Sequence, residues 1–180
     1  MQIGTSVLMV VDVQNGFLTE KTRHILQVIT NLVDRWQKLN GKTIYTRYFN
    51  YEDSAFERLM NWRQLYSPPD TNIADELTSY AEHSLKLDKY AYSAVTPEFT
   101  KLLQAHNWTD VVICGIDTDL CVLKTALDAF EHNLTPWVIT NASASTGGDH
   151  LHKAGMAVLG RAIGEHHLVT AEEFLLNFEQ

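Results

Sequence analysis

The sequence predicts an α/β protein in which a parallel sheet of about six strands lies between two layers of helices. Segments with the apolar periodicity of strands and of helices alternate along the 180 residues, without a long linker, low-complexity stretch or internal repeat. The first strand-like run, 6–13, is almost continuously apolar, as expected for a parallel strand covered on both faces. We therefore expect residues 1–180 to form one three-layer αβα domain.

The first third of the chain fits this class element by element. After the first strand, a helix is expected at 22–39, where apolar residues recur at helical spacing and Asn40-Gly41 provides a C-terminal stop. β-Branched and aromatic residues at 43–48 predict a second strand parallel to the first. The region 51–67 is expected to be partly helical, up to the break at Pro68-Pro69.

The rest of the chain repeats the alternation. A threonine cap and a first-turn proline at Thr96-Pro97 begin one helix. The other expected elements are strands at 85–87, 110–115, 136–140 and 167–169, and helices at 119–132, 150–163 and from Thr170 onward. The βαβα order predicts a parallel sheet with right-handed crossovers.

Composition narrows the classes of function. A net charge of -8 argues against binding to nucleic acid or to anionic membrane surfaces, which leaves a small molecule as the expected partner. We expect a cytoplasmic protein, because there is no signal-like N-terminus and no apolar run approaches the roughly 18 residues that span a bilayer. The spacing of Cys114 and Cys121 fits neither a disulfide framework nor a metal site, so reduced thiols are expected.

Residues 111–122 contain the strongest indication of chemistry, because a buried strand there runs into a turn and brings Cys121 to the start of a helix. In that position the unpaired backbone N–H groups and the helix dipole favour thiolate over thiol, and the same N–H groups could hold an oxyanion. Cys114, inside the strand, is expected to be structural.

Two further residues are predicted to join Cys121. Asp12 ends the first strand and Lys89 follows the third, and ligands of such sheets bind outside the carboxyl ends of the strands where the strand order reverses. There Asp12 could accept the thiol proton, Lys89 could favour the anionic forms, and Cys121 could attack a carbonyl. The alternatives are that Asp12 only caps a turn and that Lys89 is a solvated surface residue.

Three segments in this order resemble the isochorismatase-like cysteine hydrolase superfamily, which includes nicotinamidases and N-carbamoylsarcosine amidase. They are Val-Asp-Val-Gln-Asn-Gly-Phe at 11–17, Lys-Tyr-Ala-Tyr-Ser-Ala at 89–94 and Gly-Ile-Asp-Thr-Asp-Leu-Cys-Val at 115–122. The resemblance continues at 125–129 and 152–164 and so covers nearly the whole chain.

The resemblance implies an isochorismatase-like, Rossmann-like fold and an Asp12–Lys89–Cys121 triad. Such a triad would release ammonia or an amine, form a thioester and hydrolyse it. The resemblance also implies a cis peptide between Ile116 and Asp117 that directs the N–H groups of Asp117 and Cys121 toward the oxyanion. A homo-oligomer is expected as well, and neither a metal nor an organic cofactor.

Departures from the family pattern limit the prediction of the substrate. Nicotinamidases hold a metal with histidines after the second strand, but there is no histidine between His24 and His83, so nicotinamide is not the first choice. Asp117 occupies a position that is usually small in the family, and it could point away from the pocket or place a negative charge beside the oxyanion. The candidate pocket residues are Gln14, Phe17, Arg47, Trp62, Tyr90, Tyr92 and Thr118. Arg47 could bind a substrate carboxylate or form a structural salt bridge.

Three functions therefore stay open. The first is a cysteine amidohydrolase acting on a small amide, ureido or lactam-like compound. The second is a vinyl-ether hydrolase of the isochorismatase type, in which Asp12 works as an acid and no thiol is needed. The third is a catalytically silent oligomeric binding protein. The histidines at 150, 152, 166 and 167 are expected to be polar surface or interface residues rather than metal ligands.

Overall fold

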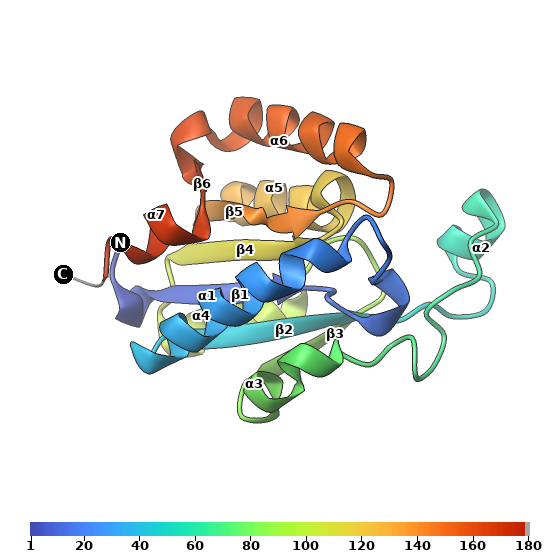
Figure 1. The fold of residues 1–180 in the computed structure, drawn as a ribbon, viewed down its shortest axis with the longest axis horizontal. Helices are drawn as coiled ribbons and strands as arrows, with labels where there is room; N and C mark the ends of the chain where they lie inside the picture. The colour runs from blue at the N-terminus through green and yellow to red at the C-terminus, as the bar shows by residue number, and fades with distance from the viewer. Residues whose placement is uncertain (179–180) are drawn as a thin grey trace.

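A computed structural model describes residues 1–178 and shows the predicted parallel sheet (Figure 1). Its six strands have the order β3-β2-β1-β4-β5-β6 and all pair in parallel. The strands are β1 (Ser6–Val11), β2 (Lys42–Tyr48), β3 (Leu85–Lys89), β4 (Asp110–Ile116), β5 (Thr135–Ala144) and β6 (Leu168–Val169). The sheet is wound outward in both directions from the neighbouring strands β1 and β4, which places the reversal of strand order between them.

Helices cover both faces of the sheet, as the α/β class requires (Figure 1). The α-helices are α1 (Leu26–Lys38), α2 (Ala55–Met60), α3 (Thr78–Glu82), α4 (Pro97–His106), α5 (Leu123–Glu131), α6 (Asp149–Ile163) and α7 (Ala171–Leu175). Helices α1, α3 and α7 contribute to one hydrophobic cluster, and α4, α5 and α6 contribute to the other. Helix α2 belongs to neither layer and projects at one end of the molecule (Figure 1).

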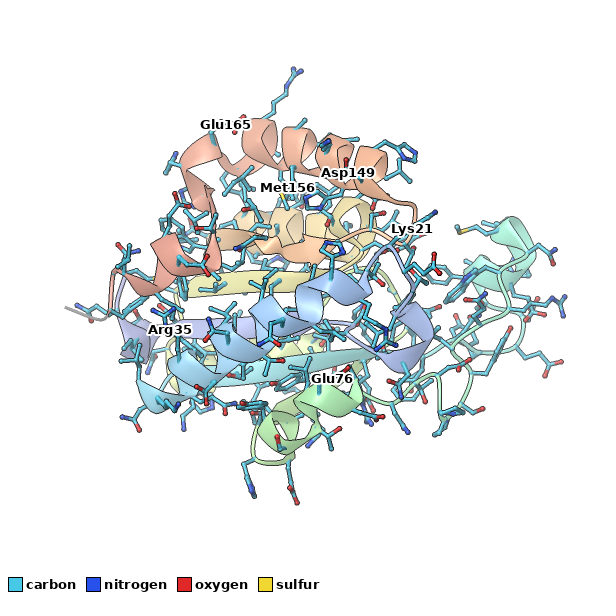
Figure 2. All side chains as sticks on the ribbon, viewed as in Figure 1. Lys21, Arg35, Glu76, Asp149, Met156 and Glu165 are labelled. Atoms are coloured by element: carbon cyan, nitrogen blue, oxygen red, sulfur yellow. The ribbon has the colours of Figure 1, made fainter. Side chains whose placement is uncertain are left out.

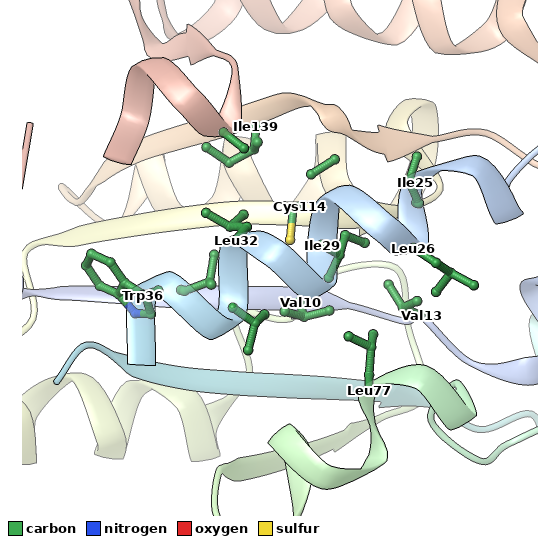
Figure 3. Packing of buried hydrophobic residues seen from close by; sticks show 14 of the residues in the cluster. Val10, Val13, Ile25, Leu26, Ile29, Leu32, Trp36, Leu77, Cys114 and Ile139 are labelled. Atoms are coloured by element: carbon green, nitrogen blue, oxygen red, sulfur yellow. The ribbon is translucent and has the colours of Figure 1, made fainter. Parts of the chain in front are cut away.

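The first cluster packs α1 against the sheet (Figure 3). Ile29 and Trp36 of α1 are fully buried, and the Trp36 indole N–H donates to the carbonyl of Lys42 over 2.9 Å. Cys114 of β4 is fully buried in the same cluster, as predicted for a structural cysteine. Each buried apolar side chain of this size contributes about 1.5–3 kcal/mol to folding, so the cluster fixes the helix against the strands.

The second cluster fixes the other helix layer. Phe99 of α4 is fully buried there, and α4 begins where predicted, because the Thr96 side chain accepts from the backbone N–H of Phe99 at 3.2 Å and Pro97 occupies the first turn. Helix α7 likewise begins with a capping box between Thr170 and Glu173. These caps confirm two element starts that the sequence indicated.

Some elements differ from the predictions. The sequence did not indicate α3, and β5 continues to Ala144 rather than ending at 140. The predicted helix at 119–132 begins as a π-helical turn, η5 (Thr118–Val122), before it becomes α5. Within residues 1–178, no helix combines the length and the apolar character needed to cross a membrane.

Candidate active site

Three side chains meet at the carboxyl ends of the strands, on the side of the molecule where α2 projects (Figure 1). Asp12 directly follows β1, Lys89 is the last residue of β3, and Cys121 lies in η5 just after β4. All three side chains are buried. The predicted positions are therefore brought together, at the point where the strand order reverses.

Lys89 connects the other two residues. Its Nζ lies 2.6 Å from Asp12 Oδ2 and 3.5 Å from Cys121 Sγ, and it also donates to the carbonyls of Ala91 at 2.9 Å and Tyr92 at 3.1 Å. Burial alone would lower the pKa of this ammonium, but the charges of Asp12 and Cys121 raise it above 10.5. Lys89 is consequently a fixed cation and not the surface lysine of the alternative interpretation.

The two carboxylate oxygens of Asp12 have different partners. The Thr46 hydroxyl donates a hydrogen bond to Asp12 Oδ1 at 2.6 Å. The backbone N–H of Asp12 donates in turn to Thr46 Oγ1 at 3.1 Å. Its Oδ2 faces Lys89 and has no hydrogen-bond partner among the described residues beyond that ion pair. The backbone φ of Asp12 is 51°, a left-handed conformation that L residues adopt at a cost of about 1–3 kcal/mol where the surroundings enforce it. Apart from Lys89, nothing among the described residues occupies Oδ2, so a lone pair there is available to a neighbouring donor.

Thr46, which sequence reasoning missed, fixes the Asp12 carboxylate. A polar residue in the middle of the buried run of β2 was the available signal, since a buried hydroxyl needs a partner.

The thiol of Cys121 is neutral at rest. Burial raises its pKa above the ordinary value, and the Lys89 ammonium opposes this effect only in part. The prediction that the helix start favours a thiolate is therefore wrong for the resting protein, because desolvation outweighs the nearby positive charge. The Asp12 carboxylate also raises the pKa of the thiol, and it is the candidate group for deprotonating it.

The turn that carries Cys121 depends on close approaches of the backbone. The Ile116–Asp117 peptide is cis, as the resemblance implied. Gly115 has a φ of +122°, and a Cβ there would lie 2.1 Å from the carbonyl oxygen of Val11, so no larger residue fits. The N–H groups of the residues on both sides of Cys121 donate to the Asp117 carbonyl, at 3.2 and 3.0 Å. The oxyanion role of the Asp117 and Cys121 N–H groups stays a prediction.

Cys121 lines a cavity of about 290 Å³ whose walls are mainly apolar and include five aromatic side chains. The lining residues are Gly16, Phe17, Thr19, Tyr48, Phe56, Met60, Trp62, Gln64, Tyr92, Asp117, Leu120, Cys121 and Thr146. The rings of Phe17 and Trp62 stack, with centroids 6.1 Å apart and an interplanar angle of 9°. Helix α2 contributes Phe56 and Met60, so the projecting segment forms one wall of the cavity.

Two loops from distant parts of the sequence meet at the edge of this cavity. The segment after β1 supplies Thr19, and the segment after β5 supplies Thr146. A Cβ on Gly148 would lie 3.6 Å from Lys21 Cδ, and Figure 2 shows Lys21 near the start of α6 at Asp149. The two loops therefore pack against each other, which the sequence did not indicate.

Three of the predicted pocket residues line the cavity, namely Phe17, Trp62 and Tyr92. Gln14 does not line it, because its buried amide binds backbone: Oε1 accepts from the Tyr48 N–H at 2.7 Å, and Nε2 donates to the carbonyls of Tyr48 and Thr71, each at 3.0 Å. Gln14 thus positions Tyr48, a pocket residue that sequence reasoning missed.

Thr118, Arg47 and Tyr90 lie outside the cavity, which corrects their predicted place in the pocket. The Thr118 hydroxyl lies 2.8 Å from Nδ1 of His152 and is buried under α6. Arg47 forms two bonds to Asp88, of 2.7 and 2.8 Å, on the other side of β2. Of the two roles left open for Arg47, the structure shows the salt bridge, which occupies the guanidinium. Tyr90 is 58% exposed and does not line the cavity.

Asp117 is one of the residues that line the cavity, and it is buried. Its carboxylate accepts from the backbone N–H of Thr146 at 2.5 Å and from Thr146 Oγ1 at 2.8 Å. Burial raises the pKa of Asp117 to about 6, and the two bonds from Thr146 oppose the rise. At neutral pH the carboxylate is mostly ionised.

The histidines at 150, 152, 166 and 167 are divided between exposed and partly buried positions. Across residues 1–178, no group of three or more His, Cys, Asp and Glu side chains could hold a metal ion. His150 and His166 are exposed. His152 differs from the prediction, because it is half-buried against Thr118, and burial lowers its pKa.

Known proteins share this arrangement of elements. The isochorismatase domain model matches residues 6–171. Isochorismatase family protein 2A of Dictyostelium discoideum is 26% identical over 145 residues, which cover 78% of this chain and 67% of that protein. A cysteine hydrolase from Pseudomonas syringae has a similar structure, with a TM-score of 0.87, 19% identity and coverage of 99% of this chain and 94% of that one. N-carbamoylsarcosine amidase from Thermoplasma acidophilum has a TM-score of 0.79, 22% identity and coverage of 93% and 96%.

Proposed function

This chain belongs to the isochorismatase-like hydrolase family, and on that premise we propose that it hydrolyses a C–N bond of a small amide through a thioester on Cys121. The observation that carries the proposal is the buried contact of Lys89 with both Asp12 Oδ2 and Cys121 Sγ, at the base of a cavity into which the thiol opens. A nucleophile and a base that both contact one fixed cation are parts that covalent hydrolysis needs. The similarity in fold to an amidase supports the same reaction.

The first half of the reaction forms the acyl-enzyme. Asp12 Oδ2 takes the proton of the Cys121 thiol while Sγ attacks the carbonyl carbon of the amide. The N–H groups of Asp117 and Cys121 are the donors for the resulting oxyanion. When the C–N bond breaks, the leaving nitrogen takes the proton from Asp12, and an amine or ammonia departs.

The second half regenerates the thiol. Water attacks the thioester carbonyl and gives a proton to Asp12, and the C–S bond then breaks as Sγ takes that proton. The sum is amide plus water to carboxylic acid plus amine, with Asp12 unchanged. Throughout, Lys89 keeps a positive charge beside whichever of Asp12 and Cys121 is anionic, which lowers the energy of the thiolate when it forms.

The proposal predicts turnover that depends on Cys121. We would screen wild-type protein for release of ammonia or amine from small amides, ureido compounds and lactams, and follow the acyl-enzyme by intact mass. Cys121→Ser and Cys121→Ala should lose the activity and the adduct, while Cys114→Ala, a change in the core, should keep both if it folds. A fully active Cys121→Ala protein would overturn the thioester route.

The same variants separate the two other functions. A vinyl-ether hydrolase should lose activity in Asp12→Asn and keep it in Cys121→Ala, because that reaction needs an acid and no thiol. A silent binding protein should show neither turnover of any amide nor labelling of Cys121 by an electrophile such as iodoacetamide. The contact of Lys89 with the Cys121 sulfur favours the thiol route.

We also propose that the protein is a cytoplasmic homo-oligomer. Both cysteines are free thiols, which is typical of a reducing compartment. Large apolar side chains of the α2 segment are exposed, among them Leu59 at 78% and Met60 at 57%, and association would cover them. Sedimentation at micromolar concentration should show a species larger than 20.4 kDa, and a monomer would contradict the proposal.

A further inference from the structure

The charges around the cavity are unequal. Asp12 and Lys89 form an ion pair behind the thiol, so their charges cancel. Among the described residues that line the cavity, Asp117 is the one carboxylate, and there is no lysine, arginine or histidine to balance it. A bound molecule therefore meets a net negative charge in a site that is otherwise mainly apolar.

The aromatic side chains of the cavity wall also favour a positively charged ligand. Phe56 packs edge-on against Tyr48, with centroids 5.2 Å apart, and against Tyr92, at 5.0 Å. Trp62 lies 5.7 Å from Tyr48 and 6.1 Å from Phe17. The faces of aromatic rings are electronegative and attract cations within about 6 Å of the ring centroid. Such a group of rings beside one carboxylate is suited to an organic ammonium ion.

We propose that this cavity selects substrates that carry a positively charged amine or trimethylammonium group, which Asp117 and the aromatic walls bind while the amide lies at Cys121. The inference names a substrate class and rests on the proposed function at Cys121. Anionic substrates are disfavoured, because their charge would face Asp117 in a poorly solvated site.

The Asp117 carboxylate can bind a ligand cation while it keeps its hydrogen bonds to Thr146. Thr146 donates one hydrogen bond to each carboxylate oxygen, and each oxygen can accept a second. If Asp117 only tied the β5–α6 loop to the turn, asparagine would serve equally well, since its oxygen can accept from the Thr146 N–H and its NH₂ can donate to Oγ1. Asp117→Asn therefore removes the charge and keeps the tie.

The test compares two probes of nearly the same shape, choline and its neutral carbon isostere 3,3-dimethylbutan-1-ol. Each is titrated by NMR into wild-type protein, Asp117→Asn and Asp119→Asn at pH 7.5. Asp119 is the matched control, because it lies on the same turn and carries the same charge but does not line the cavity. We expect wild type and Asp119→Asn to bind choline at least about tenfold more tightly than the alcohol. In Asp117→Asn the preference should fall to about twofold or less.

Three results would overturn the inference: equal or tighter binding of the alcohol to wild type, no binding of choline, or a choline preference that survives Asp117→Asn. The outcome is separable from that of the proposed function, because the titration involves no chemistry at Cys121. Cysteine-dependent hydrolysis of neutral amides without choline binding would leave the reaction standing and remove this substrate class. Choline binding by a protein with no Cys121-dependent turnover would support the cation site and remove the proposed reaction.

Discussion

Replacing Asp117 by asparagine is expected to stabilise the fold at neutral pH. Burial holds the pKa of Asp117 at about 6 in the folded protein, against 3.8 for the free side chain. Because the folded-state pKa is the higher one, the native state binds more protons between about pH 4 and 6, so stability falls as pH rises through that window. A rise from 3.8 to about 6 corresponds to roughly 3 kcal/mol of destabilisation once the carboxylate is ionised at pH 7. Asparagine avoids this cost and keeps both bonds to Thr146.

Urea unfolding of wild type and Asp117→Asn at pH 4 and 7.5 measures the effect. The gain in the free energy of unfolding on substitution should be about 2–3 kcal/mol larger at pH 7.5 than at pH 4. Asp119→Asn controls for the change in net charge, since it removes a carboxylate two residues away that does not line the cavity. A gain that is equal at the two pH values would refute the reasoning, and so would a variant that is less stable than wild type at pH 7.5.

Three further outcomes follow from the same contacts. Lys89→Met should destabilise the protein by about 3–5 kcal/mol in urea unfolding, because it leaves the Asp12 carboxylate buried without its partner. Adding Asp12→Asn should recover part of this loss, and a double variant as unstable as Lys89→Met would contradict this account. Gly115→Ala should fold poorly or lower the free energy of unfolding by more than about 3 kcal/mol in urea unfolding. At Gly4 a Cβ meets nothing within 4 Å, so Gly4→Ala should lower it by less than about 1 kcal/mol. Thr46→Val should lower kcat about tenfold with a smaller change in KM, because Thr46 positions Asp12. Thr46→Ser keeps the hydroxyl and should retain most of the wild-type kcat. An unchanged kcat in Thr46→Val would rule out a positioning role for Thr46.

The fold could be predicted from the sequence because its signals are local. Apolar runs, helical spacing and caps such as Thr96-Pro97 each concern a few neighbouring residues, and parallel strands place their carboxyl ends at one edge of the sheet. Asp12, Lys89 and Cys121 were found for the same reason, since each follows or ends a strand. The meeting of these three residues required only the topology.

The lining of the cavity could not be predicted in the same way, because it depends on side-chain direction and on contacts between distant loops. Thr46 and Arg47 are neighbours in β2, but successive side chains of a strand point to opposite faces. Thr46 consequently reaches Asp12, and Arg47 reaches Asp88 instead. The direction of Asp117 is set by Thr146, 29 positions later, a contact that no local pattern encodes.

The charges of the site suggest different roles for its two aspartates, Asp12 in proton transfer and Asp117 in ligand selection. Asp12 is neutralised by Lys89, and its Oδ2 contacts only that ammonium among the described residues, so under the proposed reaction it can exchange a proton with Cys121 without adding net charge to the cavity. Because the Cys121 thiol is neutral at rest, the negative charge that a ligand meets is that of Asp117 alone. If both proposals hold, proton transfer and ligand selection are carried out by different carboxylates. Substitutions at Asp117 should change which amides bind, whereas substitutions at Asp12 should change whether any bound amide reacts.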